Sequence, residues 1–414
     1  MKLWKPGVFR ALRHRNFKLF LYGQMLSMAG TWMQRIAQGW LAYRLTGSPL
    51  LLGYVTFASS APALFLSPLA GVIADRVNRH RMLIVAQALE MVQSLLLALV
   101  TLRGSMTPAR LVLFALLLGI LSAFENPARQ SFFVEMVSGE DLVNAIALNA
   151  SVVNAARIVG PAAAGLLVAF YGEGVCFLMN SLSFLAVIAA LLMMRLERRQ
   201  KEASSRSGPQ LLREGFAFVR QAPAVRSMLY LFAVLNFAGT PYLALLPMFA
   251  GTVLRAGPTG LGWLVSASGL GAIVSAIVLA SRSSTRGLPG ASLAASLVLG
   301  AALVVLGLSR YFPLSLAMML LVGGGYIFTL AATQMLLQTR VTEAMRGRVM
   351  SFYSLIFLGV PPFGSLFAGW VAEKIGPRMT VSLGGVVCLV ATLHFARYHR
   401  SQQAIGASDL EFSN

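Results

Sequence analysis

Long apolar segments alternate with short polar ones along the whole chain of 414 residues. Each apolar segment has roughly twenty residues or more, which is the length of α-helix that crosses the hydrocarbon core of a bilayer. The pattern therefore predicts an all-α polytopic membrane protein with twelve transmembrane helices. They are expected at residues 17–42, 49–73, 82–102, 109–133, 143–171, 175–195, 227–253, 260–280, 291–308, 314–339, 349–374 and 379–397.

Composition and charge agree with this class. Hydrophobic residues make up 57% of the chain and charged residues 12%, against roughly 45–50% and about 25% in soluble domains. A net charge of +20 in a soluble protein would suggest a nucleic-acid partner. Here the basic residues lie mostly in alternate connections between apolar segments, so the positive-inside rule explains them. We expect no nucleic-acid partner, and a multi-pass protein of the cell (inner) membrane with both termini in the cytoplasm.

The longest polar stretch divides the chain into halves. It predicts a six-helix bundle at 1–194, a cytoplasmic linker with an amphipathic helix at 195–226, a second six-helix bundle at 227–400 and a cytoplasmic tail at 401–414. A weak repeat links the halves. Ala29-Gly30-Thr31 recurs as Ala238-Gly239-Thr240, 209 residues later, whereas Gly160 and Gly165 recur as Gly364 and Gly369, 204 residues later. The repeat predicts two pseudo-symmetric bundles with a binding site between them.

Five motifs carry a family resemblance, which covers essentially the whole chain. With the twelve spans and the basic linker, they resemble the major facilitator superfamily, and within it the branch of the enterobactin exporter and the macrolide-efflux proteins. The motifs are Gly30-Thr-Trp-Met-Gln-Arg35, Gly71-Val-Ile-Ala-Asp75-Arg76-Val-Asn-Arg79, Asn126-Pro-Ala-Arg129-Gln130, Leu142-Val-Asn144-Ala145 and Ala156-Arg157-Ile-Val-Gly160-Pro161.

The resemblance implies a cytoplasmic gate after the second span. The gate motif would comprise Gly71, Asp75, Arg76 and Arg79, with Asp75 facing the start of the eleventh helix just after Arg348. The alternative is a charged anchor that only fixes topology. Where the family usually has glycine in this loop, the chain has Asn78, a residue that tolerates left-handed backbone.

The resemblance also implies that spans 1, 4, 7 and 10 line a substrate cavity. Arg35 in the first span could attract an anionic substrate, or it could be a surface arginine that reaches past Trp32 and Trp40 to the outer interface. The candidate cavity residues are Gln34, Arg35, Asn126, Gln130, Asn236, Tyr242, Tyr326, Thr333 and Gln334.

Few charges lie within the apolar segments, where each is costly and therefore a functional candidate. Glu125 and Arg129 are four residues apart on one helix face. A carboxylate removed from water binds a proton more readily, so Glu125 is a candidate proton carrier; the alternative is a static salt bridge. Arg157 needs a partner, for which Glu125 and Glu90 are the candidates. We expect a structural role for Glu90, because the third span is peripheral in this architecture.

Two departures weaken the case for proton coupling. Proton-linked drug exporters carry an arginine where this chain has Ala115, and their paired-glycine motif in the fifth helix is only partly matched by Gly160-Pro161-Ala-Ala-Ala-Gly165. We interpret Gly160, Pro161 and Gly165 as a helix-packing motif, because small residues let helices approach closely.

The sequence favours a secondary active transporter. It has no phosphate-binding loop for ATP, and its four histidines lack metal-ligand spacing, so we expect no enzyme activity, metal or cofactor. The leading hypothesis is export of a small amphipathic molecule, drug-like or siderophore-like, by alternating access in exchange for protons. The alternatives are import of a small nutrient, movement of a lipid, or a non-transporting sensor or scaffold. We expect the bilayer, a small-molecule substrate and protons as partners, and a monomer.

Overall fold

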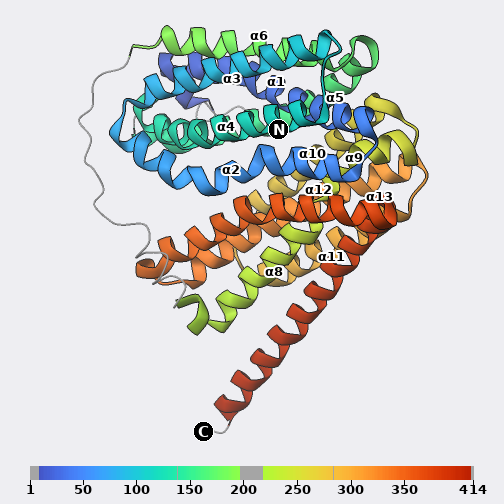
Figure 1. The fold of residues 1–414 in the computed structure, drawn as a ribbon. Coiled ribbons are helices and arrows are strands. Elements are labelled where there is room, and N and C mark those ends of the chain that lie inside the picture. The colour runs from blue at the N-terminus through green and yellow to red at the C-terminus, as the bar shows by residue number, and fades with distance from the viewer. Residues whose placement is uncertain (1–8, 138, 196–217, 283, 412–414) are drawn as a thin grey trace, which may run out of the picture. The chain divides into compact units, whose positions relative to one another are not determined.

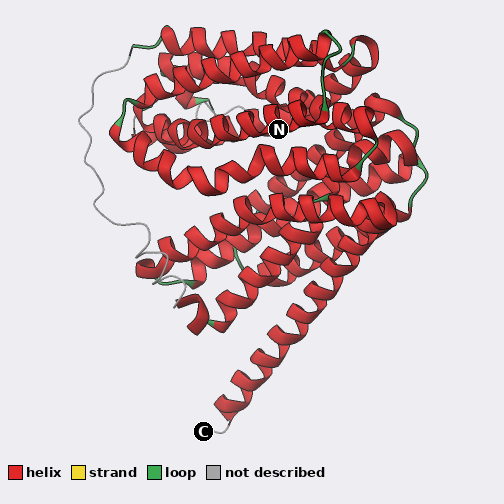
Figure 2. Ribbon diagram, viewed as in Figure 1, coloured by secondary structure: helices red, strands yellow, loops and turns green. Residues whose placement is uncertain are grey.

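The computed structural model describes residues 9–137, 139–195, 218–282 and 284–411. Every regular element in these residues is helical (Figure 2), so the all-α prediction is confirmed. The long helices of the first half are α1 (Arg15–Thr46), α2 (Pro49–Arg76), α3 (Arg79–Leu102), α4 (Pro108–Met136), α5 (Leu142–Tyr171) and α6 (Glu173–Leu192). Those of the second half are α8 (Pro223–Gly239), α9 (Tyr242–Met248), α10 (Gly257–Ala280), α11 (Leu288–Leu308), α12 (Phe312–Arg340) and α13 (Glu343–Glu411) (Figure 1). The short elements are η1 (Arg10–Arg13), η2 (Gly139–Asp141) and a π-helical turn, η3 (Phe249–Val253).

The described residues contain ten segments that are long and apolar enough to cross a membrane. One of them, Met345–Arg397, lies in α13 and is interrupted at Gly376, whose φ of 83° is not helical. Figure 1 shows α13 changing direction sharply along its length, so this segment supplies two spans. The 32-residue α1 is long enough to be a further span but is more polar than the ten. The twelve predicted spans therefore all correspond to helical segments.

Capping residues mark where α2, α3 and α4 begin after short connections. The side chains of Ser48, Asn78 and Thr107 accept hydrogen bonds from the backbone amides of Leu51, Arg81 and Arg110, at the starts of α2, α3 and α4, which is what helix N-caps do. The φ of Asn78 is −69°. The position therefore does not use left-handed backbone, and the asparagine side chain serves as the cap of α3.

The chain divides into two compact units. The first unit comprises residues 1–204 together with 247–266, and the second comprises 205–246 together with 267–414. The proposed bundle limits at 194 and 227 stay a prediction. Most of the predicted linker lies outside the described residues; of the predicted tail, 401–411 is helical.

Glycines mark the helix crossings inside each unit. A Cβ atom on Gly119 of α4 would lie 2.7 Å from the carbonyl oxygen of Ala58 and 2.8 Å from that of Ser59, both on α2. In the second unit a Cβ on Gly323 of α12 would overlap the carbonyl oxygen of Ser268 on α10. Gly119 and Gly323 are 204 residues apart, and Ser59 and Ser268 are 209 apart. These are the two offsets of the sequence repeat, so equivalent residues make equivalent crossings, as a duplicated bundle would.

Candidate functional site

A buried acidic cluster lies between α3 and α4 of the first unit. Glu125 is 6% exposed, and its Oε1 lies 3.3 Å from Nε of Arg129, one helical turn later. The same oxygen accepts a hydrogen bond from Nε2 of Gln87 on α3, also at 3.3 Å. Arg129 donates from Nη2 to Oδ1 of Asn126 at 2.7 Å. The carboxylate is thus withdrawn from solvent and held by one charged and one neutral donor.

Glu90 is a second buried acid in this cluster. It is 6% exposed and accepts a hydrogen bond from Oγ of Ser122 at 3.1 Å. Asn126, which binds Arg129, donates to the carbonyl oxygen of Ser122 at 2.8 Å, so the surroundings of the two acids share residues. Glu90 forms no ion pair with the described residues, although Arg35, Arg129 and Glu125 act on it electrostatically. Sequence reasoning assigned Glu90 a structural role. Gln87 and Glu90 are three residues apart and therefore lie on one face of α3. This spacing could have predicted that both contact the same neighbouring helix.

Two further candidate arginines of the first unit, Arg35 and Arg157, lie at one aromatic ring. The guanidinium carbons of Arg35 and Arg157 lie 5.5 and 5.9 Å from the ring centroid of Trp32, within the range of a cation–π interaction. Arg157 forms no ion pair with Glu125 or Glu90 in the described part of the structure, and its pairing with one of these carboxylates stays a prediction. Arg35 is exposed, which leaves its outer face available to a ligand.

Gln34 belongs to a buried polar network instead of an open surface. It is 0% exposed, and its Oε1 accepts hydrogen bonds from Ser94 and from Asn180, both at 2.7 Å. Its Nε2 donates to Oε1 of Gln93 at 3.2 Å, and Gln93 donates to the carbonyl oxygen of Phe114 at 2.9 Å. The network joins α1, α3, α4 and α6. Its hydrogen bonds are satisfied within the unit, so Gln34 is positioned to hold helices together.

The candidate cavity residues of the second unit also include both buried and exposed side chains. The Tyr326 hydroxyl donates to Oδ1 of the fully buried Asn236 at 3.0 Å, and the Tyr242 hydroxyl lies 3.3 Å from that of Ser268. Thr333 is buried as well. In contrast, Gln334 is exposed, as is Gln130 in the first unit. Side-chain exposure therefore selects Arg35, Gln130 and Gln334 from the predicted cavity residues.

The predicted gate motif lies at the junction of α2 and α3. Nη1 of Arg79 donates to the carbonyl oxygen of Ser131 at 3.2 Å and lies 3.5 Å from Oε1 of Glu135, so it ties this junction to the end of α4. Arg76 is exposed, and a Cβ on Gly71 would meet no atom within 4 Å. Arg348 donates to the sulfur of Met345 at 3.0 Å. The side chain of Asp75 lies outside the described part of the structure.

The small residues of α5 lie at two crossings. A Cβ on Gly160 would lie 2.6 Å from Cβ of Trp32 and 2.8 Å from the carbonyl oxygen of Ala29, both on α1. A Cβ on Gly165 would lie 2.8 Å from the carbonyl oxygen of Pro258, at the start of α10. The carbonyl oxygen of Pro161 lies against Gly262 on α10. The helices α1 and α10 therefore pack so closely against α5 that only glycine fits at Gly160 and Gly165.

We predict that Gly160→Ala destabilises the protein by about 1–3 kcal/mol, the usual cost of overpacking. The added methyl group must push α1 and α5 apart at Trp32. Gly290→Ala is the control, because a Cβ there meets no atom within 4 Å. Thermal unfolding of both purified variants in detergent measures the effect. Equal melting temperatures for the two variants would show that α1 and α5 are not held this closely.

Curated proteins similar to this chain are membrane transporters. It is 24% identical to the staphyloferrin A transporter of Staphylococcus aureus over 383 residues, which cover 91% of this chain and 95% of that protein. It is 26% identical to the multidrug efflux pump Tap of Mycolicibacterium fortuitum over 372 residues, 87% of this chain and 90% of that protein.

Solved structures show the same fold at low sequence identity. A bacterial homologue of the human lysosomal transporter Spinster superposes with a TM-score of 0.74 at 15% identity, over 96% of this chain and 98% of that one. The nucleoside transporter NupG superposes with a TM-score of 0.71 at 14% identity, over 92% of this chain and 98% of that one. Residues 7–413 match the sequence profile described as transmembrane secretion effector. The chain therefore belongs to the transmembrane secretion effector family of major facilitator transporters, and it is a multi-pass membrane transporter and not an enzyme.

Proposed function

We propose that the chain exports a small amphipathic molecule, drug-like or siderophore-like, by alternating access in exchange for protons. The observation that carries the proposal is the buried cluster of Glu125, Arg129 and Glu90. The names of two relatives, a staphyloferrin A transporter and a multidrug efflux pump, support this substrate class. The proposed location is the cell (inner) membrane with both termini in the cytoplasm, and a monomer suffices for this mechanism.

The cluster offers a way to couple protons to a conformational change. Breaking a buried ion pair by removing one partner costs about 3–5 kcal/mol, because the other charge is left uncompensated. Protonation of Glu125 would neutralise the partner of Arg129 and free the arginine to find another acceptor. A membrane potential supplies roughly 2.3 kcal/mol per charge per 100 mV, which is of the same order. Proton entry from outside would then favour one state, and proton release inside would favour the other.

The exposed polar side chains are the proposed substrate contacts. Arg35 and Gln130 belong to the first unit and Gln334 belongs to the second. The role proposed for Asn126, Tyr326 and the buried candidates is to hold the helices that carry these contacts. Arg157 shares the Trp32 ring with Arg35, so a ligand that draws Arg35 away would change the surroundings of Arg157. We propose that this exchange connects substrate binding to the coupling residues.

The gate motif is proposed to close the cytoplasmic end. Arg79 already holds the start of α3 to Glu135 at the end of α4. The proposed partner of Asp75 is the start of α13 near Arg348, where the helix dipole favours an anion by about 0.3–1 kcal/mol. A contact of that size biases a conformational equilibrium without locking it.

Transport assays in whole cells test the proposal. Cells that produce the chain are expected to accumulate less of a fluorescent amphipathic dye, or of a labelled siderophore, than cells without it. A protonophore should abolish the difference. Greater accumulation in producing cells would instead indicate import. If the protonophore changes nothing, the export is not driven by protons.

A further inference from the structure

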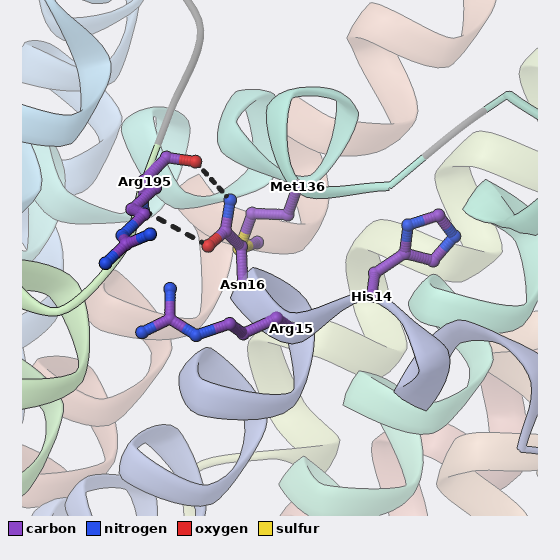
Figure 3. A pocket seen from close by; sticks show the side chains of 5 residues that line it. All are labelled: His14, Arg15, Asn16, Met136 and Arg195. Carbon is purple, nitrogen blue, oxygen red and sulfur yellow. Dashed lines mark hydrogen bonds between the residues drawn. The ribbon is translucent and has the colours of Figure 1, made fainter.

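An open pocket of about 380 Å³ lies at one end of the first unit, away from the acidic cluster. It is lined by His14, Arg15, Asn16, Met136 and Arg195 (Figure 3). These residues belong to the start of α1, the end of α4 and the segment after α6. The charge bias of the sequence predicts that this end faces the cytoplasm, so the pocket lies at the level of the lipid headgroups.

Two of the lining residues, Arg15 and Arg195, are cations to which no described acid is bound. The side chains of Arg15 and Arg195 are exposed, and within the described residues neither forms an ion pair. Both extend on the same side of Asn16 in Figure 3. An exposed guanidinium group presents its donors in a planar fork that matches the oxygen atoms of a phosphate group.

The described carboxylates near the pocket, Glu140 and Asp141, are bonded to other residues. Asp141 accepts hydrogen bonds from Arg10 and from Nε2 of His14, the latter at 2.8 Å, and Glu140 accepts one from Arg10 at 3.3 Å. The hydrogen bonds from His14 and Arg10 lower the pKa of Asp141, so this carboxylate is ionised near neutral pH and stays paired with Arg10. Among the described residues that line the pocket, His14 is bonded to one of these carboxylates, which leaves the two arginines for an external anion.

Asn16 holds Arg195 in place at the pocket. Its side-chain Nδ2 donates to the carbonyl oxygen of Arg195 at 2.8 Å, and its Oδ1 accepts from the amide of Arg195 at 3.3 Å. These two hydrogen bonds fix the backbone of Arg195 beside the first turn of α1. The side chain of Arg195 therefore starts from a backbone position that is held beside that of Arg15.

The start of α1 adds a second attraction for an anion. No side chain caps this helix, and its first turn contains no acidic residue. The first-turn amides of an α-helix have no acceptor within the helix, and the helix dipole is positive at this end. The pocket thus joins two guanidinium groups to an uncapped helix start, an arrangement that suits a phosphate group.

We propose that this pocket binds the phosphate group of an anionic phospholipid from the cytoplasmic leaflet. Basic pockets at the cytoplasmic ends of transmembrane helices take up such headgroups. The position of the pocket favours a lipid over a soluble phosphate compound, because its walls are the ends of membrane-spanning helices. The bound headgroup would connect the start of α1 to the end of α6 through Arg15 and Arg195, and so stabilise the first unit.

Thermal unfolding in detergent tests the proposal, because a ligand that binds only the folded state raises its melting temperature. Phosphatidylglycerol should stabilise the wild-type protein by several degrees, in a saturable manner, and phosphatidylcholine should not. The double variant Arg15→Gln/Arg195→Gln should lose at least half of this increase while keeping the elution volume of the folded protein.

Arg103→Gln/Arg310→Gln is the matched control, since it also removes two exposed arginines but leaves the pocket intact. It should keep the full response. An equal loss in both double variants would show that phosphatidylglycerol acts on net charge alone and would overturn the site. If inorganic phosphate gives the full stabilisation and the lipid adds nothing, the occupant is a soluble anion and the lipid assignment is wrong.

Discussion

Glu125→Gln should reduce proton-driven export at least about tenfold. Glutamine has the shape of a protonated glutamate and can still accept the hydrogen bond from Gln87, but it cannot bind or release a proton. It also leaves Arg129 without the charge that lies 3.3 Å from its Nε in the wild type. We expect the protonophore-sensitive part of export to fall at least to about a tenth, because loss of 1.4 kcal/mol of coupling energy already changes an equilibrium tenfold.

Proteoliposomes separate lost coupling from lost folding. In them, the variant should still move substrate down its own concentration gradient, and an imposed pH gradient should no longer accelerate this movement. Glu343→Gln is the control, because its side chain is 90% exposed at the start of α13 and lies 3.9 Å from Arg346. Normal pH-driven export by Glu125→Gln would reduce the Glu125–Arg129 pair to a static salt bridge.

Glu90 provides the internal comparison for this result. It is as buried as Glu125 but is bound by a neutral hydroxyl group and not by an arginine. If Glu90→Gln abolishes coupling and Glu125→Gln does not, the transported proton is carried on Glu90. The two variants therefore decide which acid of the cluster titrates during transport.

The sequence predicted the helices well and the orientation of their side chains poorly. Helix positions follow from long apolar runs. Which face of a helix packs inward does not follow, because lipid is as apolar as the protein core. Phe170 is 77% exposed and Phe177 is fully buried, although both are phenylalanines of predicted transmembrane segments.

The candidate site shows the same limit. Spacing alone identified the pairing of Glu125 with Arg129, since residues four apart lie on one helix face. The roles of Gln34 and Arg157 depend on contacts with residues more than fifty and more than one hundred positions away, Gln93 and Trp32. The sequence did not predict which candidate side chains are buried. Gln34 and Arg35 are neighbours on α1, yet Gln34 is buried and Arg35 is exposed.

The second prediction concerns the crossing of α10 and α12, which the sequence repeat relates to that of α2 and α4. Gly323→Ala should prevent stable folding of the second unit. The new methyl group would overlap the backbone carbonyl oxygen of Ser268, and a backbone atom cannot turn aside as a side chain can. We expect a loss of about 3 kcal/mol or more, at the upper end of overpacking costs, which is a large share of the 5–15 kcal/mol that stabilises most proteins.

The fraction of monodisperse protein after detergent extraction measures this loss, with Gly290→Ala as the control. Gly119→Ala at the equivalent crossing should cost less, because its Cβ would lie 2.7 Å from the nearest carbonyl oxygen, farther away than the Cβ at Gly323 would lie from that of Ser268. Adding Ser268→Ala should not rescue Gly323→Ala, since the obstructing carbonyl group remains. A rescue would mean that the hydroxyl group of Ser268 is the obstacle, and that α10 and α12 can separate enough to accept a methyl group between their backbones.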